Sequence, residues 1–250
     1  MWRDGEVAAA IAAEVGQRLM ELRSAEPSGT ASLGARGDAA AHSVLLARLR
    51  QLRSDDPVVS EEGDVANAPI ARRFWLVDPL DGTREYAERD RSDWAIHVAV
   101  VTDGVVTAGA VALPRVGSCS RPSIRRQCRQ YCRRRFASSS AARDHRPSRT
   151  HSRQLSAGRL FPWGPPGRKT AAVILGEAHA YVHAGGQREW DSAAPVAVAQ
   201  AAGLHASRLD GSPVRYGSRN FQLPDLLIAH PTCSRLLLDA LRALGAAARG

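Results

Sequence analysis

The sequence has 250 residues, of which 44% are hydrophobic, so it is long and apolar enough to bury the core of a globular protein. It contains no apolar run near the roughly 20 residues that cross a bilayer, and its charged N-terminus lacks the apolar stretch of a signal peptide. We therefore expect a cytoplasmic protein with no membrane partner.

The net charge of +9 is unevenly placed along the chain. Residues 115–168 hold 14 arginines and a single acidic residue, a charge of +13, which leaves −4 for the rest of the chain. Such a block could bind a polyanion through phosphate charge. It interleaves few aromatic side chains for base stacking, such as Tyr131 and Phe136, which argues against nucleic acid as a partner.

The N-terminal segment predicts two helices. Residues 4–24 carry apolar side chains on one face at a period of 3.6 residues. A second helical pattern follows Asp38 and ends at the breaker formed by residues 54–57. A short extended run, residues 58–60, then leads into Glu61.

Three further runs favour β-strands. Residues 74–77 form a short apolar strand that Pro79 and Gly82 should stop. Residues 94–101 and 105–113 flank an Asp-Gly turn, which is typical of a hairpin.

Regular patterns return at Lys169, after the arginine-rich block. Residues 170–175 and 178–183 resemble paired strands around Gly176, and helices are predicted at residues 192–202 and 233–248. The mixture of strands and helices indicates an α/β or α+β class.

The turn after the buried strand carries the first candidate chemistry. Asp78 and Asp81 can converge if Pro79 fixes a sharp turn, which can also aim the Leu80 carbonyl inward. These are hard oxygen ligands of the kind that Mg²⁺ prefers. With Glu61 from the neighbouring segment, the site would carry enough negative charge for more than one cation.

Gly82 and Thr83 follow this turn directly. If a helix starts here, its free amides would face a phosphate, and the Thr83 hydroxyl with Asp38 could orient and help deprotonate an attacking water. Taken singly, Glu61 could instead belong to a solvated turn, and Asp38 and Asp191 could be ordinary helix caps.

Three motifs together resemble the inositol monophosphatase-like superfamily. They are a Glu-Glu turn at residues 59–63, the strand-turn Trp-Leu-Val-Asp-Pro-Leu-Asp-Gly-Thr at residues 75–83, and a late Trp-Asp within residues 189–195. Within the superfamily, Leu80 and the sequences of residues 84–86 and 181–187 are most similar to those of the bacterial 3'(2'),5'-bisphosphate nucleotidases.

The resemblance implies a layered α-β-α-β-α sandwich, Mg²⁺ dependence and a small phosphorylated substrate. It implies removal of the 3'-phosphate of 3'-phosphoadenosine 5'-phosphate, a by-product of sulfate assimilation, and by analogy a homodimer. The metal ligands implied are Glu61, Asp78, the Leu80 carbonyl, Asp81 and Asp191. The implied substrate contacts are Leu80, Asp81, Gly82, Thr83 and Asp191, and the implied catalytic residues are Asp38, Thr83 and Glu61.

The resemblance covers roughly residues 4–114 and 169–245. We therefore divide the chain into an N-terminal metal-binding half at 1–114, an anomalous segment at 115–168 and a C-terminal half at 169–250. We hypothesise that the anomalous segment is a frameshifted translation that disrupts the second half. Resequencing that confirms the reading frame, with the arginine-rich peptide found by mass spectrometry, would rule out a sequencing error.

Other functions stay open from sequence. The same metal site could serve an inositol monophosphatase or a fructose-1,6-bisphosphatase, because it attacks any suitably placed phosphate monoester. From a different class, the chain could bind polyanions through the arginine-rich segment, or could be an inactive relic that keeps its ligands.

Overall fold

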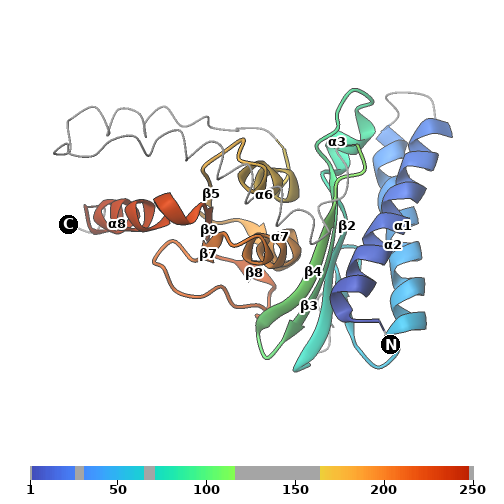
Figure 1. Ribbon diagram of the computed structural model, residues 1–250. Coiled ribbons are helices and arrows are strands. Elements are labelled where there is room, and N and C mark those ends of the chain that lie inside the picture. The colour runs from blue at the N-terminus through green and yellow to red at the C-terminus, as the bar shows by residue number, and fades with distance from the viewer. Residues whose placement is uncertain (1, 26–30, 65–70, 116–163, 248–250) are drawn as a thin grey trace.

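The computed structural model describes residues 2–25, 31–64, 71–115 and 164–247. Within these residues the chain forms five layers: a helix pair, a sheet, a second helix pair, a smaller sheet and a final helix (Figure 1). This confirms the predicted α-β-α-β-α class. The predicted disruption and frameshift concern a segment that lies, apart from its ends, outside the described residues.

The first layer consists of α1 (Asp4–Ala25) and α2 (Ala31–Leu52), which cover one face of the larger sheet (Figure 1). The helix predicted to follow Asp38 in fact begins at Ala31, so Asp38 lies inside it. Gly34 and Gly37 lower the helix propensity of α2, but without side chains they let α2 pack closely against Thr83 and Tyr86. A Cβ atom on Gly37 would lie 2.6 Å from the ring of Tyr86, so packing outweighs propensity here.

The larger sheet has the order β1 (Val58–Ser60), β2 (Arg73–Asp81), β3 (Ala95–Thr102) and β4 (Val105–Ala112). Strand β1 runs parallel to β2, whereas the other pairs are antiparallel. The predicted hairpin is present, with positive φ angles at both Asp103 and Gly104.

Strand β2 does not stop before the acidic turn as the sequence suggested. It continues to Asp81, and the ladder to β3 shifts register between Asp78 and Asp81. This irregularity accommodates Pro79, which has no N–H to donate to a ladder. The short helix α3 (Thr83–Ala87) follows directly.

The central helices are α6 (Pro166–Ile174) and α7 (Glu189–Ala201), which lie between the two sheets (Figure 1). The predicted strand at residues 170–175 is therefore wrong, because most of it belongs to α6. Pro166 fits the first turn of a helix, where its missing N–H has no cost. The alanine-rich segment that follows buries its apolar residues against α7 and the larger sheet.

The smaller sheet consists of β5 (Ala180–His183), β9 (Leu226–Ala229) and β7 (His205–Ser207), all antiparallel in that order. A two-stranded ribbon of β6 (Gln187–Arg188) and β8 (Gln222–Leu223) lies nearby. Helix α8 (Pro231–Ala247), which the sequence predicted, contacts β9. The strand expected at residues 178–183 exists, but its partner is β9.

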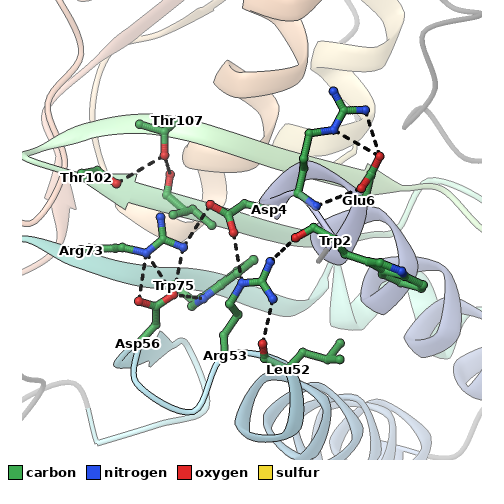
Figure 2. A network of polar contacts seen from close by, with 12 residues as sticks. Trp2, Asp4, Glu6, Leu52, Arg53, Asp56, Arg73, Trp75, Thr102 and Thr107 are labelled. Carbon is green, nitrogen blue, oxygen red and sulfur yellow. Dashed lines mark hydrogen bonds and ion pairs between the residues drawn. The ribbon is translucent and has the colours of Figure 1, made fainter.

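A polar network fixes the start of β2 at the end of the sheet remote from the acidic turn (Figure 2). Arg73 pairs with Asp56 at 2.9 Å and with Asp4 at 3.0 Å, and Asp4 also pairs with Arg53 at 3.1 Å. The indole N–H of Trp75 donates to Asp56 at 3.1 Å. The network joins α1, the end of α2 and β2, so it secures the helix pair to the sheet.

No helix in the described ranges is long and apolar enough to cross a membrane.

Candidate metal centre and active site

The parallel pairing of β1 and β2 brings the first two carboxylates together. Ser60 lies opposite Val77 in the ladder, so Glu61, which follows β1, lies beside Asp78 of β2. Asp191 reaches the same place from the first turn of α7. One carboxylate oxygen from each of these three residues lies within 4.8 Å of the others.

The acidic turn itself is held by backbone donors. The Leu80 N–H donates to Asp78 Oδ1 at 3.0 Å, and the Gly167 N–H at the start of α6 donates to Asp81 Oδ2 at 3.0 Å. Asp78 and Asp81 are both buried. The turn is therefore fixed by groups from both halves of the chain.

The carboxylates repel one another and are partly removed from water. Burial, followed by the charges of Asp81 and Glu61, raises the pKa of Asp78 well above its usual range. The Glu61 side chain keeps exposed surface, but partial desolvation and the charge of Asp191 raise its pKa to about 7, and burial raises the pKa of Asp191 to about 6. A divalent cation would relieve this repulsion, and these hard oxygen donors fit one.

A second pair of residues lies beside the acidic cluster. The Thr83 hydroxyl donates to Asp38 Oδ1 at 3.1 Å, and it also lies 3.4 Å from the Leu80 carbonyl. Burial and the nearby charge of Glu62 raise the pKa of Asp38 to about 6. Gly82, with φ +93°, makes the turn into α3 in a conformation that favours glycine.

The structure thus gathers the residues that the sequence selected into one region. The sequence predicted a helix that begins after Asp191, at residue 192, but Asp191 lies inside the first turn of α7. There Asp191 Oδ2 accepts the Arg188 N–H at 2.8 Å, so the residue caps the helix while its carboxylate also faces the cluster. The roles assigned to these residues remain predictions.

Sequence reasoning missed His97 and Gly167. His97 lies on β3 with no exposed surface, and its Nε2 atom is 3.2 Å from Asp81 Oδ2. In sequence it is a lone histidine in an apolar strand, which gives no signal of its neighbours. Gly167 lies near the end of the anomalous segment at 115–168, so its part in holding Asp81 could not be predicted from a regular pattern.

Comparison with known proteins gives a consistent result. The Inositol monophosphatase family profile matches residues 4–243. The "3'-phosphoadenosine 5'-phosphate phosphatase" of Mycobacterium leprae is 40% identical, covering 96% of this chain and 93% of that protein. The "3'(2'),5'-bisphosphate nucleotidase CysQ" of Escherichia coli is 33% identical over 73% of this chain and 78% of its own length.

A solved structure supports the fold. The crystal structure of CysQ from Bacteroides thetaiotaomicron superposes with a TM-score of 0.64 at 21% identity, covering 91% of this chain and 97% of that one.

Proposed function

Since this chain belongs to the inositol monophosphatase family of phosphatases, we propose that it is a Mg²⁺-dependent phosphomonoesterase that removes the 3'-phosphate of 3'-phosphoadenosine 5'-phosphate. The proposal includes a cytoplasmic location and a role in clearing this by-product of sulfate assimilation.

The observation that carries the proposal is the convergence of Glu61, Asp78 and Asp191 within 4.8 Å, with Asp81 next to them. Carboxylates placed so closely on separate elements are costly unless a cation binds between them. Glu61, Asp78, Asp81, Asp191 and the Leu80 carbonyl would hold the metal. When bound, Mg²⁺ would offset negative charge on the phosphoryl group and on the leaving oxygen.

The residues around the cluster would position the other reactants. Thr83, held by Asp38, would orient the attacking water, and the Asp38 carboxylate would take up its proton through the Thr83 hydroxyl. The backbone of Gly82 and Thr83 would contact the phosphate. Asp38 suits a base because its raised pKa still leaves it ionised near neutral pH.

The choice of substrate rests on the relatives. Two curated relatives that match most of this chain are named for nucleotide 3'-phosphates. An inositol phosphate or fructose 1,6-bisphosphate would need the same metal cluster, so the cluster alone does not separate the three substrates.

The test measures phosphate release from 3'-phosphoadenosine 5'-phosphate with Mg²⁺ and with a chelator. We compare the wild type with Asp81→Asn and with Asp239→Asn as a matched control. Asp239 lies on the surface of α8, where its contact is a 3.5 Å ion pair with Arg242. We expect Mg²⁺-dependent release in the wild type and control, and a loss on the order of 10²–10³-fold in Asp81→Asn.

Two results would overturn the proposal. Faster release from inositol 1-phosphate or fructose 1,6-bisphosphate would keep the chemistry and replace the substrate. A folded wild-type protein with no release from any of the three would indicate the inactive relic.

A further inference from the structure

We propose that His97 is a positioning residue that holds the metal ligand Asp81 through its Nε2 atom. The inference rests on the proposed metal-dependent function and adds to the metal site a nitrogen donor that the sequence motifs do not contain.

The position of His97 follows from the sheet. His97 lies opposite Asp78 in the ladder between β2 and β3, and the bulge in β2 brings Asp81 close to the same ring. Its Nε2 atom lies 3.2 Å from Asp81 Oδ2, and its Nδ1 atom lies 3.9 Å from Asp78 Oδ2. The ring therefore faces the two aspartates with different nitrogens.

Helix α6 packs against the imidazole near its Nε2 atom. A Cβ atom built on Gly167 would lie 2.3 Å from His97 Nε2 and 2.9 Å from Ala95 Cβ, so only glycine leaves room for the ring. The N–H of the same glycine donates to Asp81 Oδ2. The Gly167 N–H and the His97 Nε2 atom thus both lie against Oδ2 of Asp81.

The His97 ring is fully buried, yet neither of its nitrogens makes a well-directed hydrogen bond in the described part of the chain. A buried polar atom without a partner is unfavourable, so its retention beside a carboxylate indicates a bond that forms in another state. Hydrogen bonds in such sites are often poorly aligned without ligand and tighten when it binds. Carboxylates that ligate metals are commonly held by outer donors of this kind.

Three substitutions at this position separate positioning from other roles. His97→Gln can place an amide N–H near Nε2, toward Asp81. His97→Asn is shorter and places its amide near Nδ1, away from Asp81. His97→Leu fills the space with no donor.

The measured quantity is the affinity for Mn²⁺, which electron paramagnetic resonance detects. Mg²⁺ is added as a competitor, and no substrate is present. The melting temperature of each metal-free variant serves as the folding control. We expect His97→Leu and His97→Asn to bind both cations on the order of 10-fold to 100-fold more weakly than wild type, and His97→Gln to recover most of the loss.

Equal affinity in wild type and a folded His97→Leu would overturn the proposal. So would a His97→Gln protein as weak as His97→Asn, since that would make the ring a direct ligand or a packing group. If His97→Leu does not fold, the comparison of Gln with Asn still decides. Because no substrate is present, a protein that binds Mn²⁺ in this pattern but releases no phosphate would overturn the proposed function alone.

Discussion

Thr83 Oγ1 lies 3.1 Å from Asp38 Oδ1, which joins the start of α3 to the interior of α2. If this pair activates water, Thr83→Ala and Asp38→Asn should each lower kcat by about 10²–10⁴-fold. Their affinity for Mg²⁺ should stay near wild type, because neither residue belongs to the proposed ligands. Thr83→Ser keeps the hydroxyl and should retain most activity. Steady-state kinetics at saturating and limiting Mg²⁺ measure kcat and the apparent affinity for Mg²⁺. Equal losses of kcat in Thr83→Ser and Thr83→Ala would contradict a role for the hydroxyl.

The pH dependence of the reaction should reflect Asp38. A general base works only when deprotonated, and the pKa of Asp38 is raised to about 6. We therefore expect kcat/KM to rise with pH through about 6 and then level off. The rising limb should change in Asp38→Asn, whereas an unchanged limb would assign it to another group.

The acidic cluster predicts how stability depends on pH and on metal. Glu61, Asp78 and Asp191 have folded-state pKa values above those of exposed carboxyls, so the folded protein binds protons that the unfolded chain releases. The metal-free protein should therefore lose stability as pH rises from about 4 to about 7. Mg²⁺ replaces these protons.

Thermal unfolding at pH 5 and pH 8, with Mg²⁺ or with a chelator, measures this effect. The increase in melting temperature caused by Mg²⁺ should be larger at pH 8. An equal increase at both values would show that the cation binds elsewhere.

Gly167→Ala tests the close packing of α6 on the cluster. Alanine is the better helix former, so propensity alone would predict a small gain in stability. The added Cβ would instead lie 2.3 Å from His97 Nε2, and relieving this clash should cost about 1–3 kcal/mol of unfolding free energy. Gly5→Ala in α1, where a Cβ atom meets nothing within 4 Å, is the matched control. Chemical denaturation of both variants gives the comparison.

Much of the first half could be predicted because its patterns are local. The period of α1, the Asp-Gly hairpin and the acidic turn depend on residues close in sequence. The start of α2 could not be predicted, since Gly34 and Gly37 argue against a helix until the packing of α3 is known. The role of His97 could not be predicted either, because the residues around its ring come from β2 and α6, which are distant from it in the sequence.

The segments after Lys169 were harder to interpret. Residues 170–175 have the apolar content of either a strand or a helix, and only contacts with α7 and the larger sheet distinguish them. Strands β7, β8 and β9 are at most four residues long, which is too short for an alternating pattern to be recognised.

Helix α7 packs on the larger sheet and also contacts β7 of the smaller one, and it supplies Asp191. During synthesis, Glu61, Asp78 and Asp81 leave the ribosome long before Asp191 does. The cation-binding set is therefore incomplete until residues far apart in the sequence have come together, and contacts between such distant residues form slowly. In refolding experiments we expect Mn²⁺ uptake to lag behind the formation of strands β2–β4, so that a bound ion reports that α7 has docked on the larger sheet.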